Sequence, residues 1–216
     1  MTNIHKLVHS YIDNDISIKK MLYENLINIS SLARKISKEY RMEKNMDAII
    51  SAIRRYENAP VRYQNQKKIY DLLKETKVLT RNKLSSCLIQ KHQNIQKEIS
   101  LIYELVNFSA GEILRIFELE TYIKLIFDEK NYDKILNKIN AKNILNRSKD
   151  LCEINLIYPE IVTKIPGVFA LISQELANNE ISIIDSMICH SEHLIILDKK
   201  DFQVAFETIN KLTNKK

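Results

Sequence analysis

A short pattern occurs twice in this chain of 216 residues, at an offset of 70 residues. Residues 127–132 read Phe-Asp-Glu-Lys-Asn-Tyr and residues 197–202 read Leu-Asp-Lys-Lys-Asp-Phe. Each copy follows a short apolar run and precedes an amphipathic helix pattern, so the duplication covers a whole strand-turn-helix segment. The C-terminal two-thirds of the chain is therefore expected to hold two copies of one small α/β unit.

Both copies predict the same order of elements: strand, helix, strand, strand, helix. This order is that of the ferredoxin-like plan, in which two helices cover an antiparallel sheet. A fourth strand is available around residues 144–145 in the first copy, but only four residues follow Leu212 in the second. The second sheet is expected either to be short or to borrow an edge strand. The predicted strands and helices are 84–89, 95–106, 113–117, 122–126 and 132–140, then 152–157, 167–177, 181–189, 193–198 and 201–212.

The N-terminal part has a different character, because apolar residues recur there only at helical spacing. Residues 1–59 contain no glycine, and their apolar residues form successive amphipathic helix patterns. Asn28 or Ser30 is suited to cap the third helix, and Asp47 suits the start of the fourth. A further helix pattern over residues 62–76 connects this block to the first repeat. The chain is expected to be an α+β protein with an N-terminal helical domain.

Basic residues are concentrated in the N-terminal part. The chain has 33 Lys and Arg against 27 Asp and Glu, a formal net charge of +6. Residues 1–79 hold 15 basic and 9 acidic residues, which leaves 18 of each for residues 80–216. This asymmetry favours an acidic partner for the N-terminal segment alone, with double-stranded DNA the leading candidate. A lysine-rich helix surface that only faces water would produce the same charge distribution.

Several classes of function find no support in the residues. The chain has no apolar run of the roughly 20 residues that span a bilayer, so no membrane association is expected and the cytoplasm is the default location. The three cysteines, Cys87, Cys152 and Cys189, are expected to be small buried side chains in a reducing compartment. His190 and His193 flank a hairpin turn, where exposure is the usual outcome. We expect no metal, no cofactor and no enzymatic activity.

The start of the helix in the second copy carries a recognisable segment. Residues 164–173 read Lys-Ile-Pro-Gly-Val-Phe-Ala-Leu-Ile-Ser, and residues 176–183 read Leu-Ala-Asn-Asn-Glu-Ile-Ser-Ile. They resemble the ACT domain, a small-molecule-sensing module whose helix opens at Pro-Gly-Val and leads to a strand of the form Ile-x-Ile. The resemblance covers residues 151–212 and, in element order alone, residues 84–145. Asn179 stands where the family usually has a glycine, and asparagine tolerates the left-handed conformation next best.

This resemblance implies an effector site for a free amino acid at the Gly167 turn. A residue without a side chain lets a ligand approach the backbone, and the N–H groups at a helix start receive a carboxylate. Alternatively, Gly167 only makes a tight turn and Pro166 a rigid helix entry. The residues expected at the ligand are Ile165, Pro166, Gly167, Val168, Asn179 and Asp185.

The third and fourth N-terminal helices, with the turn at residues 41–45 between them, resemble a helix-turn-helix. Residues 45–58 take the place of its recognition helix. The combination is similar to an archaeal type of protein that joins a helix-turn-helix segment to ACT-like modules. The residues expected to contact DNA are Lys35, Lys38, Arg41, Lys44, Arg54 and Arg55. A helical bundle that mediates dimerisation is the alternative for this block.

The resulting hypothesis is a homodimeric regulator that responds to an amino acid and acts on transcription. Ligand at Gly167 would favour one packing of the modules and so change the spacing between two N-terminal domains. The alternative is a ligand-sensing or scaffolding protein whose helical block binds protein partners, not DNA. The expected domains are a helix-turn-helix-like domain with a connector helix at 1–80, a first ACT-like module at 81–148 and a second at 149–216.

Overall fold

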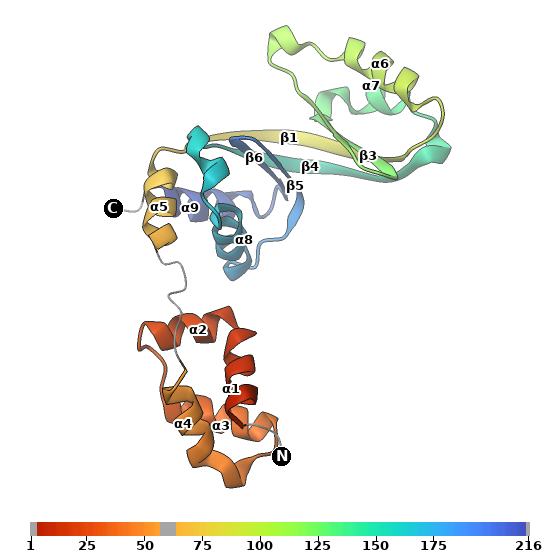
Figure 1. Cartoon of the computed structure of the whole chain (residues 1–216). Helices are drawn as coiled ribbons and strands as arrows, with labels where there is room; N and C mark the ends of the chain where they lie inside the picture. The colour runs from red at the N-terminus through yellow and green to blue at the C-terminus, as the bar shows by residue number, and fades with distance from the viewer. Residues whose placement is uncertain (1–3, 57–63, 215–216) are drawn as a thin grey trace. The chain divides into compact units, whose positions relative to one another are not determined.

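The chain forms two compact units (Figure 1). The computed structural model describes residues 4–56 and 64–214. The helical unit comprises residues 1–64, and the sheet unit comprises residues 65–216. The expected α+β class with an N-terminal helical region is therefore confirmed.

The helical unit is built from short amphipathic helices around one apolar core. Its helices are α1 (Ile4–Asp13), α2 (Ile16–Tyr23), α3 (Ile29–Glu39), the 3₁₀ turn η1 (Glu43–Asn45) and α4 (Met46–Arg54). The side chain of Asn28 caps α3 by accepting a hydrogen bond from the Ser31 N–H at 3.0 Å, as the sequence predicted. Both α1 and α3 pack on α4, which places Ile49 and Ile53 in the core together with Val8, Ile12 and Ile36.

The sheet unit is organised around one six-stranded sheet with the order β2-β3-β1-β4-β6-β5. All of its neighbouring strands pair antiparallel. Two of the strands, β1 and β4, are unusually long at 14 residues each. The strands are β1 (Lys77–Gln90), β2 (Leu114–Glu118), β3 (Tyr122–Asp128), β4 (Ile144–Ile157), β5 (Ile183–Cys189) and β6 (Glu192–Asp198).

The two copies of the repeat share the long strands instead of forming separate sheets. In the first half of the sheet, residues 84–90 of β1 pair with β3 on one side and with residues 144–151 of β4 on the other. In the second half, residues 77–81 of β1 pair with residues 153–157 of β4, which pair in turn with β6. The two copies are therefore joined edge to edge in one continuous sheet. The expected borders after residues 80 and 148 fall inside β1 and β4.

The second copy does borrow an edge strand, and it takes that strand from the segment before the first copy. Residues 77–81 of β1 lie between the predicted connector helix at 62–76 and the predicted strand at 84–89, and they include the polar residues Lys77, Thr80 and Arg81. They are largely exposed and pair only with β4. Lys83 and Asp150 have positive φ values of 54° and 53°, and the register shifts between Arg81 and Leu84. Such irregularities increase the local twist of a sheet, so they mark the junction of its two halves.

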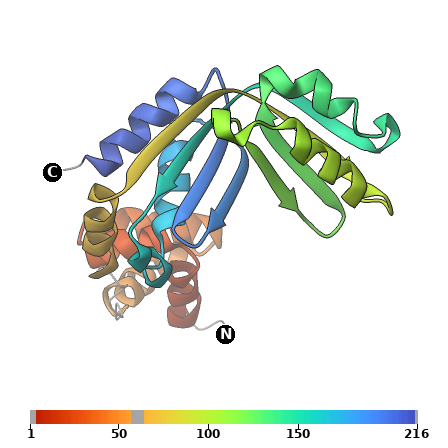
Figure 2. The ribbon, with the colours of Figure 1, turned by 90° about the horizontal axis from the view of Figure 1, so that it is seen from above.

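Helices pack on each half and close two separate cores (Figure 2). The first half carries α6 (Ile95–Leu105) and α7 (Tyr132–Leu136), and the second carries α5 (Gln64–Lys74), α8 (Val168–Asn178) and α9 (Phe202–Thr213). At the junction of the halves, Leu84 pairs with Leu151 in a small third cluster with Ile126 and Ile196. Burial of each such side chain stabilises the fold by about 1.5–3 kcal/mol. The remaining 3₁₀ turns are η2 (Phe108–Ala110), η3 (Glu129–Asn131), η4 (Ala141–Asn143) and η5 (Glu160–Lys164).

One local expectation about the repeat differs from the structure. The left-handed residue after α8 is Glu180, with φ of 59°, whereas Asn179 has φ of −100° and ends the helix. Asp128, at the end of β3, caps no helix with its side chain and accepts a hydrogen bond from the Ile113 N–H at 2.7 Å. Among the described residues, no helix is long and apolar enough to cross a membrane.

Candidate functional site

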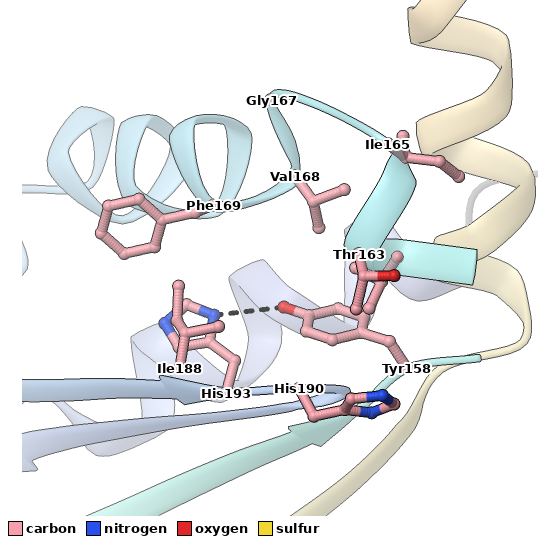
Figure 3. A pocket seen from close by; sticks show the side chains of 10 residues that line it. Tyr158, Thr163, Ile165, Gly167, Val168, Phe169, Ile188, His190 and His193 are labelled. Atoms are coloured by element: carbon pink, nitrogen blue, oxygen red, sulfur yellow. Dashed lines mark hydrogen bonds between the residues drawn. The ribbon is translucent and has the colours of Figure 1, made fainter. Parts of the chain in front are cut away.

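A cavity of about 190 Å³ lies at the start of α8, in the second half of the sheet (Figure 3). Its walls come from three places: the segment after β4, the first residues of α8, and the β5–β6 hairpin. Phe169 and Ile188 are about half exposed, at 47% and 52%, so they form an apolar rim. The lining residues are Tyr158, Val162, Thr163, Ile165, Gly167, Val168, Phe169, Ile188, His190 and His193.

Gly167 is the N-cap of α8, and its backbone is left-handed with φ of 96°. A side chain at this φ would be strained, which explains the glycine. No side chain caps α8, so the first N–H groups of the helix remain available to an anion beside the cavity. A Cβ atom on Gly167 would also lie 3.4 Å from Cδ1 of Ile69, which belongs to α5.

The floor of the cavity is a hydrogen-bonded chain centred on His193, in which Tyr158 and His193 are buried. The Tyr158 hydroxyl lies 3.1 Å from Nδ1 of His193, and the Ser186 hydroxyl lies 3.0 Å from Nε2 (Figure 3 draws the first contact). The ring of Phe169 packs over the imidazole with 5.3 Å between ring centroids.

Burial controls the charge of this floor. Desolvation lowers the pKa of His193 to about 4 and raises the pKa of Tyr158. Both groups are therefore neutral near pH 7. No acidic side chain is among the residues that line the cavity. A neutral floor beside the positive end of the α8 dipole suits a carboxylate more than a cation.

Three of the six residues expected at the ligand line this cavity: Ile165, Gly167 and Val168. Pro166 is exposed between them and does not line it. Asn179 is at the opposite end of α8, where its side-chain amide donates to the Glu175 carbonyl at 2.9 Å. Asp185 lies on β5 and forms an ion pair with Lys124 of β3 at 3.0 Å. The structure thus brings together the turn residues but not the two polar residues that follow α8.

Sequence reasoning missed the floor and the rim of the cavity. His193 was expected at an exposed turn, but it is 1% exposed because strand alternation directs it toward the core covered by α8 and α9. His193 shares one face of β6 with Ile195 and Leu197, but residues 193–197 are buried on both faces, so no alternation in the sequence marks His193 as buried. His190 is exposed, as expected. The expected burial of the three cysteines is confirmed for Cys87 and Cys152 but is wrong for Cys189, which is exposed.

The six basic residues expected at DNA are all exposed on the helical unit. Lys35 and Lys38 project from α3, whose other exposed positions include Ser30, Ser31 and Arg34. Arg41 and Lys44 belong to the turn between α3 and α4, and Arg54 and Arg55 end α4. None of the six forms an ion pair with a described residue. These positions leave their charges available to a partner in solution.

Comparison with known proteins identifies the fold and nothing finer. No protein-family model matches the sequence, and no curated protein does. Among solved structures, aspartate kinase from Clostridium acetobutylicum matches with a TM-score of 0.53 and 14% identity, over 64% of this chain and 34% of the kinase chain. The chain therefore spans about a third of that enzyme.

Subunits of the same class of enzyme match over nearly their whole length. Aspartokinase alpha and beta subunits give a TM-score of 0.51 at 14% identity, over 63% of this chain and 97% of the other. The ligand-free regulatory subunit of aspartate kinase from Thermus thermophilus gives 0.50 at 11% identity, over 62% and 95%. The chain has an ACT-like fold. This agrees with the resemblance seen around Gly167, whereas the helix-turn-helix assignment and the archaeal type stay predictions.

Proposed function

We propose that this protein is a regulatory protein, not an enzyme, and that it responds to a free amino acid bound in the cavity at Gly167. The observation that carries the proposal is the combination of an uncapped helix start and a cavity with a neutral, hydrogen-bonding floor. The sheet unit would then consist of two ACT-like modules that share β1 and β4. In the described part of the chain, no group of three or more His, Cys, Asp or Glu side chains could hold a metal ion.

The chemistry of the cavity matches the parts of an amino acid. Its carboxylate would accept hydrogen bonds from the first N–H groups of α8, as anions do at helix starts. Its side chain would pack against Val168, Phe169 and Ile188. The volume of about 190 Å³ is below the ~300–1,000 Å³ of pockets for drug-sized ligands, which favours a small effector.

Helix α5 is the element placed to respond to the effector. Ile69 of α5 lies against Gly167, and Ile69, Leu72 and Leu73 are buried in the same core as Val168. In the sequence, α5 directly follows the helical unit. A ligand that prefers one position of the Gly167 turn would therefore favour one position of α5.

The output of the regulator is proposed to be DNA binding by a homodimer through the helix-turn-helix-like α3–η1–α4 segment. The exposed, unpaired basic residues of this segment support that proposal. The regulatory subunits of aspartate kinase with the same fold support a regulatory role, although their enzyme is a different protein. The second candidate is a sensing scaffold, whose helical unit would bind a protein partner instead.

Calorimetric titration of the full chain with each of the standard amino acids tests the effector site. Gly167→Ala is the informative variant, because its Cβ would strain the turn that carries the N–H groups. Gly111→Ala is its matched control: Gly111 also has a positive φ, of 79°, and nothing lies within 4 Å of its Cβ position. Both substitutions should lower stability by about 1–2 kcal/mol.

Only Gly167→Ala should weaken the binding of the effector, by about tenfold or more, which corresponds to about 1.4 kcal/mol. Gly111→Ala should bind as tightly as the unmodified chain. No heat with any amino acid would count against the proposal, and so would equal binding by the two variants.

A further inference from the structure

A second cavity, of about 320 Å³, separates β2 from the β5–β6 hairpin. Figure 2 shows these elements as the outer strands of two arms that diverge from β1 and β4. Its apolar lining consists of Leu114, Ile116, Met187 and Leu194, and its polar lining consists of Arg115, Cys189 and Glu192. None of these residues lines the cavity at Gly167.

Ion pairs hold the two sides of this cavity in place. Arg115 of β2 donates two hydrogen bonds to the carboxylate of Glu153 on β4, at 3.2 and 3.1 Å. Glu153 is 2% exposed, so the carboxylate of this ion pair is buried. Lys124 of β3 pairs with Asp185 of β5 at 3.0 Å. The cavity therefore has walls that are fixed relative to each other, as a preformed binding site requires.

Two charged side chains face the cavity, Arg115 and Glu192, and a buried residue orients each of them. Glu153 holds Nε and Nη2 of Arg115, which leaves donors on Nη1. Asn155, which is 5% exposed, donates its amide to Oε2 of Glu192 at 3.1 Å. The Oδ1 atom of the same amide is buried and accepts no hydrogen bond from any described residue.

We propose that this second cavity binds a small zwitterion with an aliphatic body. Its ammonium group would bind Glu192, whose charge no cation of the described residues neutralises. Its carboxylate would bind the remaining donors of Arg115, and its body would pack on Met187 and Leu194. Because the lining holds one cationic and one anionic side chain, a ligand that carries both signs pairs with both. This site is independent of the effector site proposed at Gly167.

The exposed thiol of Cys189 supplies a reporter inside the cavity. Cys87 and Cys152 are buried, and burial raises the pKa of both thiols, so they react slowly with a water-soluble aromatic disulfide. The probes are L-leucine, isopentylamine and isocaproate, which share a similar aliphatic body and carry both charges, only the ammonium or only the carboxylate. Peptide mass spectrometry of the labelled chain identifies the modified cysteine.

Leucine should slow the labelling of Cys189 more than either single-charge probe. A ligand with a Kd near 1 mM, added at about 10 mM, leaves roughly a tenth of the sites empty, so the rate should fall about tenfold. An unchanged rate with leucine would overturn the proposal. Equal protection by all three probes would also overturn it, because the aliphatic body alone would then account for binding.

Two variants separate this cavity from the one at Gly167. Glu192→Gln keeps the size of the side chain and an acceptor for Asn155 but removes the charge, so protection by leucine should fall to that given by isocaproate. Gly167→Ala should keep the full protection, because Gly167 lines only the other cavity. Protection that survives in Glu192→Gln, or that is lost in Gly167→Ala, would contradict the second site. Protection lost only in Glu192→Gln would support it even if Gly167 binds no amino acid.

Discussion

Gly167 and His193 form two sides of one cavity, but only Gly167 could be recognised from the sequence as part of a site. Gly167 stands out because the chain has only two glycines, and a left-handed helix start requires one of them. His193 does not stand out, because a histidine near a hairpin turn is usually exposed. Its burial depends on β6 lying between β4 and β5 under α8 and α9. The neutral floor of the cavity is therefore a tertiary property.

The buried imidazole makes the stability of the protein depend on pH. The pKa of His193 is about 4 in the folded chain and about 6.5 when unfolded, so the unfolded state binds more protons between these values. The contribution of neutral His193 to the free energy of unfolding is fully present above about pH 6.5 and is lost as the pH falls toward about 4. Between about pH 7.5 and about pH 5, the loss amounts to about 2 kcal/mol.

Denaturant unfolding of the full chain and of His193→Gln at these two pH values measures the effect. The variant should be less stable at neutral pH, but its stability should fall with pH by about 2 kcal/mol less than that of the unmodified chain. Parallel pH profiles for the two proteins would show that His193 is not the group responsible.

Strand β1 shows how one element can serve both halves of a sheet. Residues 84–90 are central and pair on two sides, whereas residues 77–81 pair only with β4. The central part was recognised in the sequence as the predicted strand at 84–89, and residues 84–87 are buried in the structure. The polar part could not be recognised, because exposed strands carry no apolar alternation and depend on a partner far away in the chain.

Proline substitutions test whether residues 77–81 complete the second half. Only alternate N–H groups of an antiparallel strand point to its partner, so one of Leu79→Pro and Thr80→Pro removes a hydrogen bond to β4. The other removes an N–H at the open edge and acts as the matched control. Both side chains are exposed, so packing is little affected.

One of the two variants should be less stable by about 1–3 kcal/mol, and the amides of residues 153–157 should then exchange faster with deuterium. The amides of residues 122–128, in the first half, should stay protected. If neither variant changes exchange in β4, residues 77–81 do not stabilise the second half.

For the whole molecule, most of the excess positive charge belongs to the helical unit. Residues 1–64, which form this unit, hold 11 Lys and Arg against 7 Asp and Glu, so they carry four of the six excess charges. The proposed effector cavity and the second cavity both lie in the sheet unit. A regulator built in this way would separate the surface that binds the acidic partner from the surface that binds the effector.

Electrophoretic retardation of DNA over a salt series tests the proposed partner. The logarithm of affinity should fall with the logarithm of salt concentration by roughly 0.9 for each phosphate contact. Replacement of Arg54 and Arg55 by Ala should reduce this slope by about 2 and weaken binding, if each contacts one phosphate. Replacement of Lys199 and Lys200 by Ala, which removes the same charge from the sheet unit, should change neither. Absence of retardation at low salt would favour the scaffold whose helical unit binds a protein.

The sequence by itself determined the class of the fold, the repeat, the helical N-terminal part and the turn at Gly167. These features follow from local rules: apolar periodicity, helix capping and the need for glycine at positive φ. Only the tertiary structure decided that the repeats share β1 and β4, that His193 is buried and that Arg115 meets Glu153. Each of these depends on which strands become neighbours. That choice is made by the burial of the whole apolar surface at once, and no local pattern encodes it.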